Sequence, residues 1–239
     1  GPPKSSESYL NMQALISAAL LTGSEAIHPG VGFLSENADF AEIVNAHGIT
    51  FIGPSPMHIR TMGDKVAAKK AAKEVGLPLV PGSDGEISSV QQAQKEATRI
   101  GYPVIIKASL GGGGRGMKVA NSKSELSEAF SSARSEAKAA FGDDTVYMEK
   151  YLKNPRHIEV QIFADSHGNV VHLGERECSI QRRHQKLFEE CPSPILSSKE
   201  RQSIGELSSQ ATKKLGYLGL GTIEYLYEEN AFYFIEMNT

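Results

Sequence analysis

A loop with five glycines in six positions constrains this chain more than any other feature. The apolar run Val104–Ile106 ends at Lys107. The glycines fall within Gly111–Gly116, and Met117–Ala120 has the composition of a second strand. Because glycine has no Cβ, such a loop bends freely and its backbone N–H groups can approach an anion. Lys107 and Arg115 add positive charge. The pattern predicts a strand–loop–strand flap that closes over a polyphosphate.

Two other phosphate-binding loops do not fit this stretch. A P-loop ends in Gly-Lys-Ser/Thr and runs into a helix, whereas Gly116 here leads into apolar residues that suit a strand. The dinucleotide-binding fingerprint also requires a helix after its glycines. A flexible hairpin without a ligand remains the alternative, because a glycine-rich loop alone is a weak signal.

Composition excludes several classes of protein. The chain has 239 residues, 40% of them hydrophobic, and 25 basic against 28 acidic residues give a net charge of −3. No basic field would draw it to nucleic acid or anionic lipid, and no apolar run is long enough to cross a bilayer. We therefore expect no nucleic-acid partner and no membrane. Two cysteines, Cys178 and Cys191, are a poor disulfide framework and predict free thiols in a cytoplasmic, reducing setting.

Helical and strand patterns alternate at the start of the chain. Helices are predicted over Ser6–Thr22 and Asn37–His47, and strands over Glu25–His28 and Ile49–Ile52. Short connections between such elements indicate a parallel α/β unit. No strand precedes the first helix and the chain ends inside a strand pattern, so we expect a fragment of a longer protein.

The fold class predicted is mixed α/β and α+β, in four parts. Residues 1–63 form a partial N-terminal α/β domain, and residues 64–79 form a connecting helix. Residues 80–151 form a lid that carries the flap, with a long helix that Ser122 and Glu125 start as a capping box. Residues 152–239 form part of an antiparallel sheet covered by a helix at 198–215.

The final hairpin gathers acidic residues. Glu236 and Asn238 lie two apart on a predicted strand and so point to one face. The short turn between the strands brings Glu224 close to opposite Glu236. Carboxylates side by side repel, and a divalent cation bound with nucleotide phosphates relieves the repulsion. The alternative is a charged, solvated sheet face.

Other polar stretches are less specific. Glu149, Lys150 and Leu152 fall at the junction of two units, where an adenine could bind, although an ordinary strand end explains them equally well. The cationic run Gln181–Lys186 could hold a small anion or an outer phosphate, but charge runs are usually solvated. Lone cations such as Lys65 and His157 are more typical of surfaces than of sites.

Seven segments carry a further signal. They are His28–Asn37, Met62–Lys65, Gly101–Lys107 with Gly111–Gly116, Tyr147–Tyr151, Arg156–Glu159, Gly174–Arg183 and Phe234–Thr239. Together they resemble the biotin carboxylase family of the ATP-grasp superfamily, over nearly the whole chain. The likeness is greatest to the biotin carboxylase of bacterial acetyl-CoA carboxylase, while pyruvate and propionyl-CoA carboxylases share much of the pattern. It implies an ATP-grasp fold after a partial pre-ATP-grasp domain.

The resemblance also implies roles for individual residues. The ATP site would consist of Lys65, Lys107, Gly112, Gly113, Gly114, Arg115, Gly116, Met117, Glu149, Lys150, Leu152, His157, Gln181 and His184. Catalytic roles near phosphate and bicarbonate would fall to Lys107, His184 and Lys186. Two Mg²⁺ or Mn²⁺ ions would be held by Glu224, Glu236 and Asn238.

The activity implied is ATP-dependent carboxylation of biotin through carboxyphosphate, as in fatty acid biosynthesis. Biotin would arrive on a biotin carboxyl carrier protein, with carboxyltransferase subunits and a second copy of the chain as partners. The family continues beyond Thr239 with an arginine, a glutamate base and a further arginine. We therefore expect residues 1–239 alone to bind nucleotide weakly without carboxylating biotin. Alternatives are another ATP-grasp ligase, such as a carbamoyl-phosphate synthetase half, and a non-catalytic nucleotide-binding or subunit-interaction module.

Overall fold

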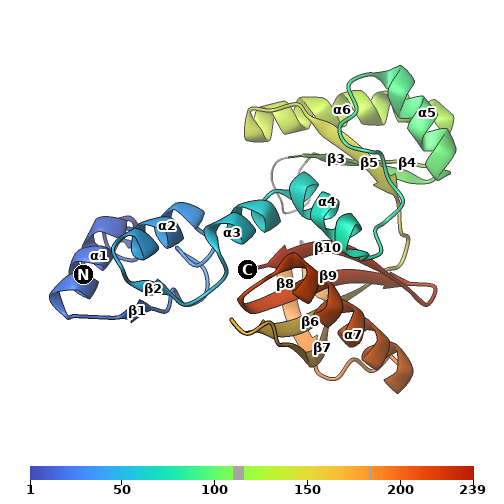
Figure 1. Ribbon diagram of the computed structural model, residues 1–239. Coiled ribbons are helices and arrows are strands. Elements are labelled where there is room, and N and C mark those ends of the chain that lie inside the picture. Colours follow the sequence, from blue (N-terminus) through green and yellow to red (C-terminus); the bar gives the residue numbers. More distant parts are fainter. Residues whose placement is uncertain (110–115, 183–184) are drawn as a thin grey trace.

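The computed structural model describes residues 1–109, 116–182 and 185–239, and these residues form three sheets (Figure 1). A small N-terminal unit extends to one side. A helical lid lies above a larger sheet, and helix α4 lies between the two. No helix in the described parts of the chain has the length and apolar character needed to cross a membrane.

The N-terminal unit has the predicted parallel pairing, between β1 and β2. Its elements are η1 (Ser5–Glu7), α1 (Met12–Leu21), β1 (Ala26–Ile27), α2 (Ala38–Ala46), β2 (Thr50–Phe51) and α3 (Pro56–Gly63). The predicted helix start at Ser6 is wrong. Asn11 caps α1 instead, because its side chain accepts a 3.0 Å hydrogen bond from the N–H of Ala14.

Helix α4 (Lys65–Val75) and the segment after it join the lid to the larger sheet. Asp64 caps α4 by accepting from the N–H groups of Val66 and Ala67 at 2.9 and 2.8 Å. Leu79 then pairs with Phe234 of the larger sheet, and Gly82 pairs with Glu149 of the lid sheet. Residues 79–82 therefore connect the edge of the larger sheet to the edge of the lid sheet.

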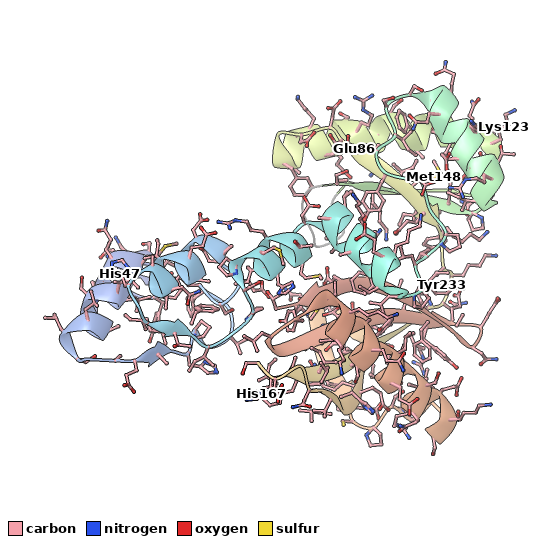
Figure 2. All side chains as sticks on the ribbon, in the orientation of Figure 1. His47, Glu86, Lys123, Met148, His167 and Tyr233 are labelled. Atoms are coloured by element: carbon pink, nitrogen blue, oxygen red, sulfur yellow. The ribbon has the colours of Figure 1, made fainter. Side chains whose placement is uncertain are left out.

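The lid is a three-stranded sheet covered on one face by two helices. Its elements are α5 (Val90–Ile100), β3 (Val104–Ala108), β4 (Met117–Ala120), α6 (Lys123–Phe141) and β5 (Val146–Lys150), with strand order β4-β3-β5. Met148 is fully buried between this sheet and the helices (Figure 2). The predicted pairing across the flap is confirmed, since Lys107 lies opposite Met117. The predicted capping box is wrong, because Ser122 makes no capping hydrogen bond and Glu125 accepts from the N–H of Asn121.

The larger sheet is antiparallel, with strand order β10-β9-β6-β7-β8. Its elements are β6 (Arg156–Ala164), β7 (Val170–Arg182), β8 (Gln185–Glu190), α7 (Ser198–Leu215), β9 (Gly219–Glu228) and β10 (Ala231–Asn238). One face buries Ile162, Ile223 and Tyr225 in a core that includes residues of α4 and α7. Gln181 and Arg182 of the cationic run lie at the end of β7, and Gln185 and Lys186 lie at the start of β8.

A bulge in β10 decides which face its one acidic residue, Glu236, occupies. Phe234 pairs with Tyr225, but the next pair is Glu236 with Glu224, so Ile235 is an extra residue. Phe234 and Met237 are both buried, although they are three residues apart. Strict alternation would have turned Glu236 toward the core. The bulge turns it to the opposite face, alongside Glu224.

Candidate functional site

Three carboxylates lie directly opposite one another across the larger sheet. Glu159 of β6 pairs with Glu224 of β9, and Glu224 pairs with Glu236 of β10. Arg176 of β7 lies opposite Glu159 and extends the line by one strand. We call the three carboxylates the acid row. Glu159 and Glu224 are only 3% and 2% exposed, so their charges need partners.

Glu224 receives three hydrogen bonds. Its Oε1 accepts from Lys186 Nζ at 2.7 Å and from Asn238 Nδ2 at 2.6 Å, and its Oε2 lies 2.6 Å from His157 Nε2. Burial raises the pKa of this carboxyl group, but the bonds from His157 and Lys186 outweigh burial and lower the pKa to about 2. Glu224 is therefore an anion at any physiological pH.

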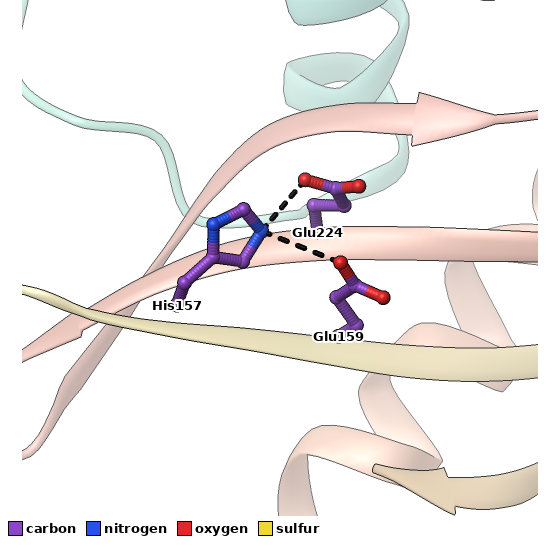
Figure 3. Close-up of side chains that lie close together, drawn as sticks. All are labelled: His157, Glu159 and Glu224. Atoms are coloured by element: carbon purple, nitrogen blue, oxygen red, sulfur yellow. Dashed lines mark hydrogen bonds and ion pairs between the residues drawn. The ribbon is translucent and has the colours of Figure 1, made fainter. Parts of the chain in front are cut away.

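Glu159 shares Lys186 with Glu224 and has Arg176 as a further partner. Its Oε2 accepts from the Arg176 guanidinium at 3.0 Å, and its Oε1 contacts the Lys186 ammonium. The Lys186 ammonium thus lies between two buried carboxylates. Figure 3 shows His157 Nε2 directed at both acids, 2.6 Å from Glu224 and 3.6 Å from Glu159. On the other side of the ring, Nδ1 of His157 lies 3.0 Å from the Gln181 side-chain amide nitrogen.

The donor set suits a divalent cation. Ligand atoms of His157, Glu159 and Glu224 all lie within 4.8 Å of one another, and carboxylate oxygens are the preferred ligands of Mg²⁺ and Mn²⁺. Of the predicted metal residues, Glu224 bonds Asn238 and pairs with Glu236. Sequence reasoning gave Glu159 no role. The available signal was its spacing of two from His157, between the buried residues Ile158 and Val160.

A second charged group lies on the lid side. Glu149 of β5 is 5% exposed, and its carboxylate contacts the Lys69 ammonium and accepts from Lys107 Nζ at 2.6 Å. Burial raises the pKa of Glu149, and the two ammonium groups outweigh burial and lower it. Lys65 begins α4 one turn before Lys69, and its positive charge lowers the pKa of Lys69. We call Lys65, Lys69 and Lys107 the lysine cluster. Lys69 was not predicted.

Tyr147 connects the two charged groups. It pairs with Lys107 across the lid sheet, and Lys69 Nζ lies 4.1 Å from its ring centroid. Burial raises the pKa of the Tyr147 hydroxyl, and the negative charges of Glu149 and Glu236 raise it further. The Tyr147 hydroxyl therefore interacts electrostatically with one carboxylate of each group, Glu149 and Glu236. A pocket of about 610 Å³ is also lined by Lys69, Tyr147 and Glu149.

The remaining predicted residues are distributed around these groups. Lys150 donates to the carbonyl oxygens of Gly101 and Tyr102 at 3.0 and 2.8 Å, so its ammonium is directed away from Glu149. Leu152 is half-buried just after β5. Met117 begins the second flap strand, and Gly116, directly before it, has φ +68°. Outside the described residues lie Gly112, Gly113, Gly114, Arg115 and His184.

Comparison with known proteins identifies the arrangement. Residues 64–239 match the family described as carbamoyl-phosphate synthase L chain, ATP binding domain, and residues 1–59 match the biotin carboxylase N-terminal domain. The chain is 59% identical to a biotin carboxylase of Haemophilus influenzae, over all of this chain and 54% of that protein. This chain belongs to the biotin carboxylase family. Its fold is the mixed α/β ATP-grasp fold of that family, as the sequence predicted.

Solved biotin carboxylases have the same fold. The crystal structure of a biotin carboxylase–β,γ-ATP complex from Campylobacter jejuni matches with a TM-score of 0.88 at 55% identity, over 98% of this chain and 53% of that one. The biotin carboxylase domain of the Hydrogenobacter thermophilus 2-oxoglutarate carboxylase, in complex with MgADP and bicarbonate, matches with a TM-score of 0.85 at 50% identity. That match covers 97% of this chain and 51% of that one. The chain thus spans about half the length of these biotin carboxylases.

Proposed function

We propose that the protein containing this chain carboxylates biotin at the expense of ATP, and that this chain supplies most of the nucleotide site. The observation that carries the proposal is a half-buried lysine cluster on the lid side and an acid row whose Glu159 and Glu224 are buried, since charges of both groups act on Tyr147. Cations on one side and a metal-binding carboxylate group on the other are what a triphosphate requires.

The nucleotide would lie between the lid and the larger sheet. Lys65 and Lys107 would hold the phosphates, and the glycine flap would close over them. The adenine and ribose would be held near the crossing from β5 to β6, by Glu149, Lys150, Leu152, His157 and Gln181. The support for this placement is that Glu149 and Lys150 lie on β5, His157 on β6 and Gln181 on β7, which are strands that carry the two charged groups, while Leu152 follows β5.

The metal would be held by Glu224, Glu236 and Asn238, with Glu159 beside them. Bound there with phosphate oxygens, Mg²⁺ or Mn²⁺ would neutralise charge on the triphosphate. Hydrogen bonds keep Glu224 ionised, so it is ready to bind a cation without losing a proton. The Lys186 ammonium lies between Glu159 and Glu224 and would attract an incoming anion to this end of the site.

Lys186, together with His184, would hold bicarbonate for attack. An oxygen of bicarbonate forms a bond to the terminal phosphorus of ATP, the bond from that phosphorus to the bridging oxygen breaks, and ADP leaves with the electron pair. The product, carboxyphosphate, breaks at its carbon–oxygen bond into CO₂ and inorganic phosphate; the phosphate takes the ureido proton of biotin, and the nitrogen bonds the CO₂. A closed flap would exclude water, which would otherwise hydrolyse carboxyphosphate. The relative bound to MgADP and bicarbonate is consistent with this substrate set.

Several finer points belong to the same proposal. The parent enzyme is acetyl-CoA carboxylase, acting in the cytoplasm with a biotin carboxyl carrier protein, carboxyltransferase subunits and a second copy of the chain. Within this chain, the proposed domains are residues 1–63, 64–79, 80–151 and 152–239. A pyruvate-, propionyl-CoA- or 2-oxoglutarate-type carboxylase is the alternative, because a 2-oxoglutarate carboxylase is among the relatives. Identifying the acyl or keto acid that the intact enzyme carboxylates separates them.

The test is bicarbonate-dependent ATP hydrolysis by the full-length protein, with and without free biotin. Biotin should stimulate hydrolysis, whereas a carbamoyl-phosphate synthetase-like ligase would not respond. Glu224→Gln should reduce turnover by at least about 100-fold, since it removes transition-state charge stabilisation. Glu229→Gln, in the turn of the same hairpin, is the matched control and should leave turnover unchanged. A rate of ATP hydrolysis that changes neither when biotin is added nor when Glu224 is substituted would refute the proposal.

A further inference from the structure

Glu149 has more positive charge around it than one carboxylate needs. Lys107 reaches it from β3 and Lys69 reaches it from α4. Both ammonium groups are mostly buried, since the two side chains are 22% and 21% exposed. Two cations against one anion leave one positive charge in excess, and the two lysines come from different structural units.

The proposed function gives this excess a purpose, and the inference rests on that function. If Lys107 is to bind a phosphate, its ammonium must share or give up Glu149. A buried carboxylate that loses its counter-ion is strongly destabilised, so Lys107 alone would be held back by Glu149. With a second cation in place, Lys107 can turn to the nucleotide while Glu149 stays neutralised.

We propose that Lys69 is a positioning residue: it holds the charge of Glu149 and so frees Lys107 for the phosphates of the nucleotide. Lys69 touches no substrate in this account and acts through Glu149. The residue is a specific feature of α4, because the neighbouring Lys70 is exposed and makes no ion pair within the described residues.

The surroundings of Lys69 fix it in this place. Its ammonium lies 4.1 Å from the centroid of the Tyr147 ring, a cation–π contact. Its helix is anchored one turn earlier by the Asp64 cap. Burial lowers the pKa of Lys69 and the Glu149 charge opposes that shift, so the ammonium depends on Glu149 as Glu149 depends on it. The aromatic ring, the carboxylate and the helix together leave Lys69 little freedom to follow a nucleotide.

A purely structural ion pair between α4 and β5 is the rival explanation, and a mutant cycle separates the two. We would measure the Kd for ATP by calorimetry on the full-length protein, as wild type, Lys69→Met, Glu149→Gln and the double variant. Lys69→Met should raise the Kd at least about tenfold, because the cost of an uncompensated buried charge exceeds the 1.4 kcal/mol that a factor of ten represents. In the Glu149→Gln background the same substitution should change the Kd less than about twofold.

Further variants keep the test decisive. Lys69→Arg retains the charge and should stay within about threefold of wild type, while Lys70→Met is the matched control and should not change the Kd. If Lys69→Met does not fold, the Kd for ATP can still be measured with Lys69→Arg and with the double variant, which leaves no unpaired carboxylate. If Lys69→Met lowers the melting temperature but leaves the Kd unchanged, the inference is overturned and the proposed function still stands. Wild-type protein that binds no ATP would overturn the proposed function, and the inference with it.

Discussion

Replacing Lys186 with methionine should destabilise the protein and make it respond more strongly to divalent metal. Its ammonium bonds Glu224 at 2.7 Å and also contacts Glu159, and both carboxylates are almost fully buried. Methionine keeps much of the side-chain volume but removes the charge. Arg176 remains on Glu159, and His157 and Asn238 remain on Glu224, so neither acid is left entirely without partners.

The size of the effect follows from these contacts. Removing one partner of a buried ion pair costs about 3–5 kcal/mol, and the 29% exposure of the Lys186 side chain places this pair at the low end, at about 3 kcal/mol. For a chain of this length each kcal/mol corresponds to roughly 2–4 °C in melting temperature. We therefore expect the melting temperature to fall by roughly 6–12 °C.

Differential scanning calorimetry with and without millimolar MgCl₂ or MnCl₂ measures both effects. Metal should raise the melting temperature of Lys186→Met more than that of wild type, because no ammonium competes for the two carboxylates and a bound ion stabilises the folded state. Lys199→Met, at an exposed position on α7, is the control and should change neither quantity. A melting temperature within about 2 °C of wild type would refute the ion-pair reasoning, and a variant indifferent to metal would refute the acid row as a metal site.

Three further outcomes are expected. Gly205→Ala should destabilise the protein by about 1–3 kcal/mol, measured by urea unfolding, because the new Cβ would lie 2.5 Å from atoms of the His172 ring; unchanged stability would contradict the close packing of α7 on β7. The hydrogen bonds that Glu200 accepts hold its pKa at about 2, below its unfolded value of about 4.3, so its stabilisation is fully present above pH 4.3 and is lost as the pH falls toward 2. Glu200→Gln should therefore melt lower than wild type at pH 7 but equally at pH 2, and an equal difference at both values would count against this pKa. Iodoacetamide at pH 8 should label Cys191, which is exposed, and spare Cys178, whose pKa burial raises to about 11; mass spectrometry showing label on Cys178 in the folded protein would argue against its burial.

Local patterns predicted the elements and the site residues that lie close in sequence. The pairing of Glu224 with Glu236 could be read from the short turn of one hairpin, and the parallel pairing of β1 with β2 from alternating elements. The place of Glu159 in the acid row could not be predicted from the sequence, because β6 and β9 are far apart in sequence and no local pattern sets their register. The bulge at Ile235 has no clear local signature either, yet it turns Glu236 to the site.

Two equivalent local signals had different outcomes. Ser122 and Glu125 have the same spacing as Ser197 and Glu200, but of these two pairs the second alone forms a capping box, because Glu125 accepts from the backbone and side chain of Asn121 instead. Lys69 illustrates the same limit for function. Its sequence neighbours are ordinary helix residues, and only the tertiary fold brings its ammonium to Glu149 of β5.

The central claim is that Lys65 and Lys107 of the lysine cluster, together with the acid row, hold one metal–nucleotide complex from two sides. A crystal structure of the full-length protein with Mn²⁺ and a non-hydrolysable ATP analogue, with anomalous difference density for manganese, tests it most directly. The account predicts a manganese peak beside Glu224, Glu236 and Asn238, with the triphosphate between that peak and Lys107. A peak remote from these acids, or a triphosphate out of reach of Lys107, would contradict it.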